Sequence, residues 1–226
     1  MLRPALVATA TLVAALSGLA GPALAIEEPK HEVVLQEDDF ELRRYAPIIV
    51  AEVTVTGDRG EASYRAFRPL ADYIFGANLP GQEIAMTAPV TQERARDGAR
   101  DGAKIAMTAP VTQEPAEPQG GAEAWRVRFT MPAEWTMDTL PRPKNPDIRL
   151  IEVPAETVAA VRFSGWWSDS SFAEERDALA AWIASKGWRP IGEPVYAYYN
   201  DPFTLPFLRR NEVLWRVEAP EAAQVR

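Results

Sequence analysis

LRRYAPIIVAEVTVTG at residues 42–57 has a counterpart further along the chain, LIEVPAETVAAVRFSG at residues 150–165. A shift of 108 residues aligns the two segments without a gap and gives five identities in sixteen positions. In each segment a strand-like run is followed by a proline turn, a second run rich in β-branched residues and a glycine. Two such units, each with one apolar sheet face, can bury these faces by packing about a pseudo-twofold axis. The sequence therefore predicts an α+β fold with a barrel-like, antiparallel-rich sheet, built from a duplicated β-α-β-β unit with two outer helices.

One helix is expected in each half, after the glycine that ends the repeated segment. Apolar residues at spacings of three and four predict an amphipathic helix over residues 60–76, in which Pro69 kinks the helix or marks its start. Residues 171–174 form a capping-box pattern at the start of the second helix. With their strands, the two pseudo-repeats span about 32–135 and 146–218. A cleft between a helix and the sheet would be the natural place for a ligand.

Strands are predicted where apolar and polar residues alternate or where β-branched residues gather. A polar loop is predicted for residues 115–121, which contain two prolines and two glycines. The predicted strands are 40–45, 48–56, 125–131, 148–153, 156–164, 194–199 and 212–217.

A second, shorter repeat lies within the first half. The phrase IAMTAPVTQE occupies residues 84–93 and again residues 105–114. Apolar residues at alternate positions predict a strand for each copy, with Met86 and Met107 on its core face, and the proline in each copy places that strand at a sheet edge or a bulge. The charged spacer 94–104 is predicted to be a solvated hairpin tip. Two interpretations stay open: two real strands, or one copy displaced as a loop after an in-frame duplication.

Residues 1–25 have the pattern of a secretory signal peptide. Arg3 supplies the positive start, an apolar run follows, and Ala-Leu-Ala at residues 23–25 offers small side chains at the cleavage positions. Cleavage would leave residues 26–226 as a single domain. Because there is no cysteine to carry a lipid, we expect an exported protein, periplasmic or secreted, with no stable membrane anchor after signal removal. An uncleaved anchor or a buried helix is the alternative for this segment.

The composition excludes several classes of function. The absence of cysteine removes thiol nucleophiles, thiolate ligation of haem and cysteine-based zinc sites. Loss of Arg3 with the signal changes the formal net charge from −8 to −9, and an acidic surface argues against nucleic acid and anionic membranes as partners. Glycine-rich phosphate loops, HExxH and acidic calcium loops do not occur. No catalytic residue and no metal ligand is therefore assigned.

Few side chains remain as candidates for chemistry. His31 is the one histidine; it lies near the expected mature N-terminus, where chains fray, and is expected to be inert. Arg209 and Arg210 could clamp an anionic ligand, or could form a charged turn that pairs with Glu212. Four tryptophans near the second helix are explained first by core packing and second by a flat aromatic ligand. These are Trp166, Trp167, Trp182 and Trp188.

Several motifs together resemble the SOUL haem-binding protein family. The phrase IAMTAPV follows a Gly-x-Asn helix end at residues 76–78, and further motifs follow in the family's order. These are FTMP at 129–132, VRFSG at 161–165, YYNDP at 198–202 and RRNEV at 209–213. The resemblance covers about residues 32–218. It implies a barrel-like α+β domain built from a duplicated unit, as the repeat already does, and tetrapyrrole binding in an apolar groove along the first helix.

The resemblance also implies which residues would bind the tetrapyrrole. The family's basic partners for the propionates fall on Tyr64 and Asp72, so Arg65 or Arg68 would have to replace them. The histidine that one branch uses as axial ligand has no counterpart, so no axial ligand is assigned. Haem would bind by burial and stacking, with a Met or Tyr near the iron. The cofactor-binding candidates are Tyr64, Arg65, Phe67, Arg68, Leu70 and Ala71.

Three functions follow from these observations. The first is a non-catalytic carrier or scavenger of haem or a related tetrapyrrole. The second is an enzyme that processes tetrapyrroles or other small molecules with a Glu or Tyr in the cleft, because one fold can host both roles. The third is a protein with a non-haem ligand, or one whose groove is filled by its own side chains. The sequence specifies no oligomeric state.

Overall fold

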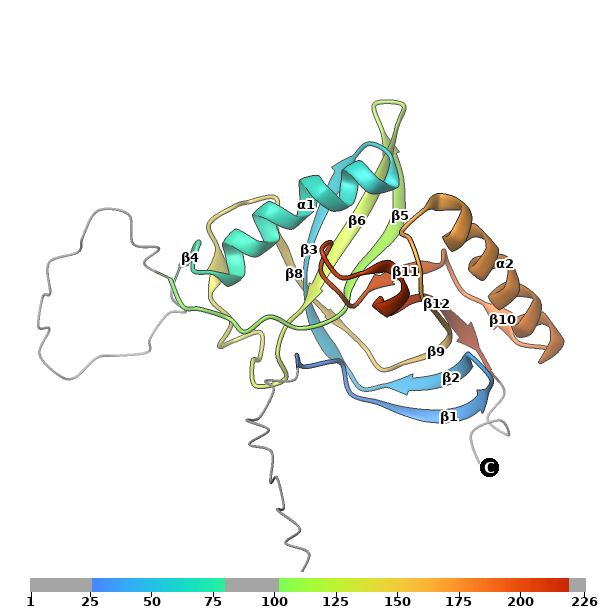
Figure 1. The fold of residues 1–226 in the computed structure, drawn as a ribbon. Coiled ribbons are helices and arrows are strands. Elements are labelled where there is room, and N and C mark those ends of the chain that lie inside the picture. Colours follow the sequence, from blue (N-terminus) through green and yellow to red (C-terminus); the bar gives the residue numbers. More distant parts are fainter. Residues whose placement is uncertain (1–25, 80–101, 220–226) are drawn as a thin grey trace, which may run out of the picture.

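The computed structural model describes residues 26–79 and 102–219 (Figure 1). The predicted signal peptide and the first copy of the repeated phrase lie outside the described residues. The elements are β1 (His31–Glu37), β2 (Phe40–Tyr45), β3 (Ile48–Thr56), α1 (Arg59–Ile74), β4 (Asn78–Leu79), β5 (Val111–Gln119), β6 (Ala122–Thr130), β7 (Arg142–Pro143), β8 (Arg149–Val153), β9 (Glu156–Phe163), α2 (Asp169–Ser185), β10 (Arg189–Pro190), β11 (Val195–Tyr198), the 3₁₀ turn η1 (Pro206–Leu208) and β12 (Asn211–Glu218).

One curved sheet carries the fold, and its strand order is symmetric. The order is β1-β2-β9-β12-β11-β5-β6-β3-β8, with β10 beside β12. A half-turn about the boundary between β11 and β5 exchanges β12 with β6, β9 with β3, and β2 with β8. The strand registers of the two halves agree. Leu42 of β2 pairs with Ala159 of β9, and the equivalent residues of the other half, Leu150 of β8 and Ala51 of β3, pair with each other. The duplicated unit is therefore confirmed, and each half lends its first strand to the sheet of the other.

Both helices lie outside the sheet, and their N-terminal ends meet (Figure 1). Asp58 caps α1 by accepting the backbone N–H of Glu61, and Ser168 caps α2 by accepting that of Ser171. The second helix thus begins before the predicted capping box, and α1 continues through Pro69. α1 packs on β3 and β6, whereas α2 packs on β9 and β12. Each helix therefore covers the strands of its own half.

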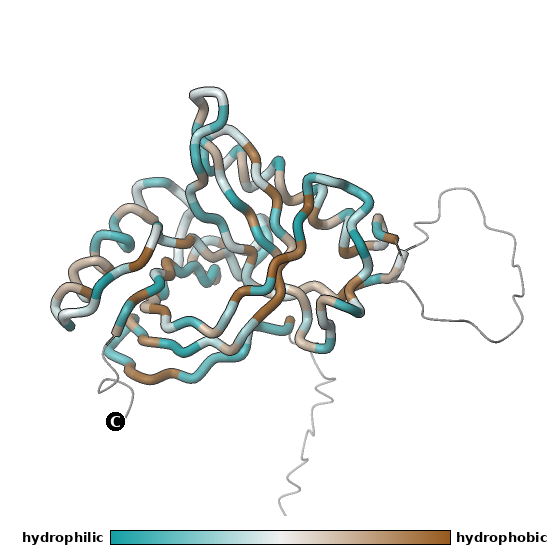
Figure 2. The backbone as a smooth tube through the Cα atoms, turned by 180° about the vertical axis from the view of Figure 1, so that it is seen from behind, coloured by the Kyte–Doolittle hydropathy of each residue, from teal (hydrophilic) through white to brown (hydrophobic). Residues whose placement is uncertain are grey.

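Core side chains fill the space between each helix and the sheet. Under α1 these include Ala51, Val53, Val127 and Phe129 from the strands with Ala66, Leu70, Tyr73 and Ile74 from the helix. Under α2 they include Ala159, Val161 and Val213 with Phe172, Leu179 and Ile183. In Figure 2 the hydrophobic colour gathers where the central strands cross, away from the tip of the β5–β6 hairpin. The helix–sheet interface, where a ligand cleft was expected, is occupied by the core.

The polar loop predicted for residues 115–121 is wrong, because β5 continues to Gln119. Pro115 sits opposite Trp125 in the β5–β6 ladder. On its other side β5 pairs with β11 only as far as Gln113. Among the described residues, the outer edge of β5 beyond Gln113 has no ladder partner, so prolines without an N–H are tolerated there.

The second copy of the repeated phrase is a strand in its last four residues only. Ile105 is buried and its N–H donates to the carbonyl of Ile74 at 2.8 Å, which ties the segment to the end of α1. Met107 is 46% exposed, so the prediction that it lies on a core face is wrong. The physical reason is that residues 105–110 form an irregular connection from the end of α1 to β5, without the two-residue alternation of a strand.

Candidate functional site

The outer face of α1 presents an aromatic stripe to solvent. Tyr64 is 87% exposed, Phe67 46% and Phe75, at the C-cap, 41%. Tyr64 and Phe67 are three residues apart, and Phe75 follows eight residues later, about two turns on, so the three rings project from the same side of the helix. Three large exposed rings in a row form the kind of surface that marks a binding site.

Two arginines flank this stripe. The guanidinium of Arg65 donates to the carbonyl of Thr56 at 3.1 Å and lies 3.8 Å from the carboxylate of Glu61. The side chain of Arg68 is 91% exposed and comes no closer than 3.9 Å to the carboxylate of Asp72. An exposed ion pair at this distance is weak, so Arg68 can turn toward an anionic group at little cost.

Two of the six predicted binding residues lie inside the protein. Leu70 has no exposed surface and packs in the core under α1, and Ala71 is only 9% exposed. Leu70 points at the sheet, whereas Ala71 lies between Phe67 and Phe75 on the line of the stripe as a small, nearly covered side chain, so neither offers a ligand much surface. Phe67 is intermediate, because its ring meets the ring of Phe129 edge-on at 5.7 Å. The structure thus brings Tyr64, Arg65, Phe67 and Arg68 together at the surface.

A second exposed apolar surface was not predicted and lies on the loop between β11 and β12. The exposed side chains are Phe203 (94%), Phe207 (70%), Leu208 (64%) and Leu205 (54%). The loop is well tied: the carboxylate of Asp201 accepts the N–H groups of Phe203 and Thr204, and Arg209 donates to the carbonyls of Pro202 and Thr204. Four large apolar residues in a short proline-bounded loop are the sequence signal that could have revealed it.

A chain of contacts connects this loop to the start of α1. Arg59, the first residue of α1, donates to the carbonyl of Trp167 at 3.3 Å, to the hydroxyl of Tyr198 and to the carboxylate of Asp169. The N–H of Gly165 donates to the carbonyl of Pro206 in η1 at 2.9 Å. The loop is therefore anchored next to the N-terminal end of α1.

Arg59 lies where the two halves meet. Its guanidinium stacks over the ring of Phe172 at 4.4 Å, and its backbone carbonyl accepts a hydrogen bond from the side chain of Gln113. Burial raises the pKa of the neighbouring Tyr198 hydroxyl, so this group stays protonated and can donate to Gln113. These contacts of Arg59 hold the two halves together, and we call them the joint between the helices. Their role is structural, since every polar group named here has a partner within the protein.

Arg209 and Arg210 form the charged turn and not an anion clamp. Arg209 stacks on Trp167 at 4.3 Å, and Arg210 pairs with Glu212 at 2.9 Å and with Glu28. Glu212 has no exposed surface and also binds Arg43 at 2.6 Å. Burial alone would raise the pKa of the Glu212 carboxyl, but the hydrogen bonds and charges of the two arginines outweigh it and hold this pKa below its usual value.

The remaining predicted candidates are structural as well. His31 begins β1 and does not fray: its ring lies 4.8 Å from the ring of Tyr45, at the opposite edge of the sheet from the strands under α1. Trp182 and Trp188 are in the core beneath α2 and Trp167 packs against it, whereas Trp166 is 69% exposed. Within the described ranges, no cluster of three or more His, Asp or Glu side chains is placed to hold a metal ion.

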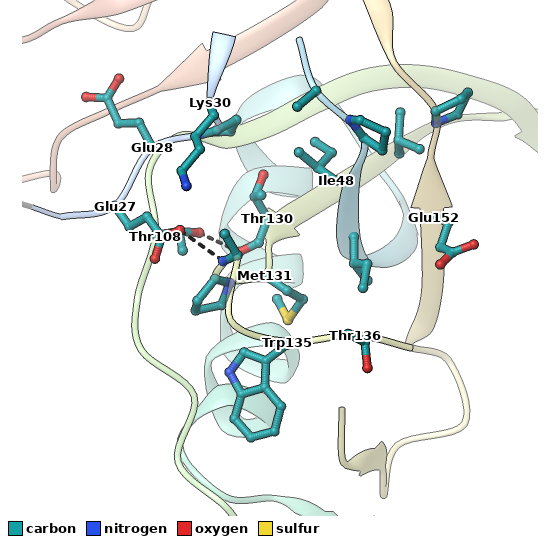
Figure 3. A pocket seen from close by; sticks show the side chains of 18 residues that line it. Glu27, Glu28, Lys30, Ile48, Thr108, Thr130, Met131, Trp135, Thr136 and Glu152 are labelled. Atoms are coloured by element: carbon teal, nitrogen blue, oxygen red, sulfur yellow. Dashed lines mark hydrogen bonds between the residues drawn. The ribbon is translucent and has the colours of Figure 1, made fainter. Parts of the chain in front are cut away.

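A pocket of about 540 Å³ lies away from the stripe, between the two proline turns of the duplicated units. Figure 3 shows Ile48, Met131 and Trp135 on its walls and the ammonium of Lys30 directed inward, with Glu152 turned outward. Glu27 accepts the N–H of Ala133 at 2.9 Å and so closes one side. Its walls are largely apolar, and the ammonium of Lys30 is a charge directed into it.

No helix in the described part of the chain is long and apolar enough to cross a membrane. The duplicated unit, the mostly antiparallel half-barrel sheet and the two outer helices define an α+β barrel-like fold class. The model of the SOUL heme-binding protein family matches residues 26–101 and 95–216, and the chain belongs to this family.

Curated relatives agree with this assignment, and solved structures share the fold. The chain is 30% identical over 193 residues to human heme-binding protein 2, covering 82% of this chain and 81% of the relative, and 28% identical to the mouse protein over the same shares. Among solved structures, the EcmrR C-terminal domain has a TM-score of 0.52 at 14% identity and covers 80% of this chain and 98% of its own. A hydrolase from Listeria innocua has a TM-score of 0.55 at 14% identity, over 80% and 93%. These two structures show a shared fold only.

Proposed function

We propose that the protein binds haem or a related tetrapyrrole on the aromatic stripe of α1 and acts as a carrier or scavenger without catalysing a reaction. The observation that carries the proposal is the row of exposed rings, Tyr64, Phe67 and Phe75, on a helix that is otherwise packed against the sheet. A macrocycle is large, flat and apolar, and stacking on aromatic rings removes its faces from water. The family assignment and the name of the human relative support the same ligand.

The charges at the stripe fit the rim of a haem. Propionates are carboxylates, and the guanidinium groups of Arg65 and Arg68 are suited to pair with them. The described residues offer no histidine near α1, because His31 lies at the far edge of the sheet. Binding would then rest on burial and stacking, with the hydroxyl of the exposed Tyr64 as a group able to approach the iron.

The loop with Phe203 and Phe207 is proposed as a second apolar wall for the same ligand. It is anchored beside the start of α1 through Arg59 and Trp167, and its rings are held outward by the turn at Asp201. An open stripe leaves one face of a macrocycle in water, so a second apolar surface nearby would add to the affinity. We also propose that the protein works outside the cytoplasm, as its signal-like first 25 residues suggest.

Titration of the purified protein with haemin tests the proposal. We expect a saturable shift of the Soret band at one equivalent. The variant Tyr64→Glu should weaken binding by at least about tenfold, because it places a carboxylate under an apolar face, a change of about 1.4 kcal/mol. Tyr64 is a cleaner choice than Phe67, whose ring also contacts the core.

Val33→Glu is the matched control, because Val33 is a 45% exposed apolar residue on β1, remote from α1. Equal affinity of the Tyr64→Glu and unaltered proteins would contradict the stripe as the site. Absence of any saturable shift would contradict haem as the ligand, and a changed pigment mass after incubation would favour an enzyme.

A further inference from the structure

The pocket between the two proline turns takes its walls from both halves of the fold. The turn between β2 and β3 supplies Ala46 and Pro47, and the end of β8 supplies Val153 and Pro154. Met131, which follows β6 and is 4% exposed, contributes a buried thioether. The volume of about 540 Å³ lies within the range that small-molecule sites occupy.

A narrower cavity of about 120 Å³ adjoins this pocket. The two spaces share six lining residues: Pro29, Ala46, Ile48, Thr130, Val153 and Pro154. Beyond them the narrow cavity is lined by apolar side chains of the sheet, from β3, β9, β11 and β12: Val50, Val158, Val195 and Leu214. The combined space is therefore elongated, with a wide part at the turns and a narrow apolar part over the strands.

The charged residues of the narrow part are paired within the protein. Arg216 lies 3.0 Å from the carboxylate of Glu156, and Arg128 pairs with Glu52 at 2.7 Å and with Glu114 at 2.8 Å. Paired charges do not require a charged ligand, so the narrow part is suited to a hydrocarbon chain.

The segment that precedes β1 forms a fixed wall of the wide part. The N–H groups of Ala109 and Ala133 donate to the carbonyl and to the carboxylate of Glu27, both at 2.9 Å. The N–H of Ala46 donates to the carbonyl of Lys30 at 3.1 Å. The segment is thus held at both ends, and the position of the Lys30 backbone is defined.

Lys30 is the charge that the wide part offers to a ligand. Its ammonium is directed inward and, within the described ranges, has no ion-pair partner (Figure 3). The three carboxylates at the rim are engaged or turned away: Glu27 accepts a backbone N–H, Glu28 pairs with Arg210 at 2.9 Å, and Glu152 points outward. An anionic group is therefore favoured at Lys30, and an organic cation is not.

We propose that this two-part cavity binds a fatty acid, with its carboxylate at Lys30 and its unbranched chain in the narrow part. Such a molecule carries one anionic head and one flexible apolar chain, as the single free ammonium and the elongated apolar space require. Neither space is lined by a residue of α1, so the site is separate from the aromatic stripe and the ligand is additional to haem.

Calorimetric titration with decanoate and decanol, below the concentrations at which they aggregate, tests the head and the chain separately. We expect saturable binding of decanoate at one equivalent, weaker by up to about fourfold for each methylene removed from the chain. Absence of saturable decanoate binding would overturn the proposal.

Lys30→Met tests the head contact, because it removes the ammonium and keeps an apolar side chain of similar length. We expect decanoate to bind about three- to fivefold more weakly, since an ion pair that reaches water is worth little, and decanol to bind as before. Lys144→Met is the matched control: this exposed lysine follows β7, lines neither space and should leave both affinities unchanged. Equal losses for acid and alcohol, or equal losses in the two variants, would overturn the assignment of the head to Lys30.

Val195→Phe tests the narrow part by filling it. We expect decanoate binding to fall by at least about tenfold, with the circular-dichroism spectrum of the unaltered protein retained. If this variant does not fold, Ala46→Phe, at an exposed position shared by the two spaces, takes its place. Unchanged decanoate affinity in a folded filling variant would overturn the proposal.

Haemin titration separates this site from the proposed haem site. Lys30→Met, and the unaltered protein saturated with decanoate, should bind haemin as before. Displacement of haemin by decanoate would place both ligands at one site and overturn the separate cavity. A protein that binds decanoate but no haemin would contradict the haem proposal alone, and one that binds haemin but no decanoate would contradict this inference alone.

Discussion

The two helices occupy equivalent places in the duplicated fold, but their outer faces differ. Counted from the N-caps Asp58 and Ser168, Tyr64 corresponds to Glu174 and Phe67 to Asp177. Phe75, further along, corresponds to Ser185. All six residues lie at the exposed surface, aromatic on α1 and polar on α2. The backbone symmetry has therefore been kept while one helix alone acquired a surface suited to a flat apolar ligand.

The inner faces of the two halves differ in a related way. Glu52 on β3 is 1% exposed and binds Arg128 and Arg149, whereas Ala160 stands at the corresponding position of β9. The second half instead has its buried carboxylate on β12, at Glu212. Each half thus buries one carboxylate with its arginines, but the two carboxylates lie on strands that the pseudo-twofold axis does not exchange. Symmetry governs the strands, and the side chains that specialise the protein do not follow it.

The largest difference between the halves is expected in the free energy of unfolding that is lost when the buried carboxylate of each half is removed. Glu212→Ala removes the acceptor of two guanidinium nitrogens of Arg43, itself 2% exposed, and of the Tyr199 hydroxyl, while Glu41 still pairs with the Nε of Arg43, and should cost about 3–5 kcal/mol of unfolding free energy. Glu52→Ala should cost roughly 1–2 kcal/mol, because the partner Arg149 reaches water and Arg128 keeps Glu114. Urea unfolding measures both, and equal losses would contradict the asymmetry.

A smaller difference in unfolding free energy is expected between substitutions of Arg59 and Asp169, the ion pair that joins the starts of the two helices. Arg59→Leu should cost about 2–4 kcal/mol, because it removes the donor to Tyr198 and Trp167 from a site that is 7% exposed. Asp169→Ala should cost less than about 1 kcal/mol, since its carboxylate is 85% exposed. A loss after Asp169→Ala as large as that after Arg59→Leu would show that the ion pair itself, not the burial of the guanidinium, holds the joint.

The arginines of α1 should contribute modestly to the proposed haem site. Arg68→Ala should weaken haemin binding by up to about fivefold, because an exposed ion pair is worth at most about 1 kcal/mol. The same variant should leave the affinity for haemin dimethyl ester unchanged, since the ester has no propionate charge. Ala178 stands at the position of Arg68 on α2, so α2 offers no such contact. An equal loss for acid and ester would show that Arg68 acts through its apolar stem.

The smallest expected effect is a pH dependence on α2. Burial, followed by the charges of Glu174 and Asp39, raises the pKa of the Glu175 carboxyl. The folded state then holds this proton more tightly than the unfolded state, so stability falls as the pH rises through the raised pKa. Glu175→Gln should therefore stabilise the protein at pH 7 by roughly 0.5 kcal/mol or less and change nothing at pH 4. Thermal unfolding at the two pH values measures this, and a gain at pH 4 would contradict it.

The fold was predictable because its signals are local and occur twice. Strands 40–45 and 48–56 match β2 and β3, and the proline turn and the terminal glycine recur at the expected shift. Gly57 and Gly165 both have a φ near +125°, at 127° and 124°, which explains why the alignment ends on glycine in both halves. Period-two alternation and capping residues are properties of short segments and can be read without the rest of the chain.

The candidate site was predictable only in part. Helical spacing places Tyr64 and Phe67 together, but it does not show that the side chains of Leu70 and Ala71 are covered. The apolar loop at Phe203 was missed, because only the tertiary contacts that hold the loop beside α1 show that its rings lie near the candidate site. The prolines of β5 were misread as a loop, because an unpaired outer edge is a property of the whole sheet.

The sequence by itself determined the duplicated unit, the places of most strands and the two capped helices, since these depend on residues close in the chain. Only the tertiary structure decided that Arg59 meets Asp169, that Glu212 is buried between Arg43 and Arg210, and that the exposed rings lie on one helix of the pair. The reason is physical: a pattern fixes which face of an element is apolar, whereas partners far apart in sequence are chosen by packing.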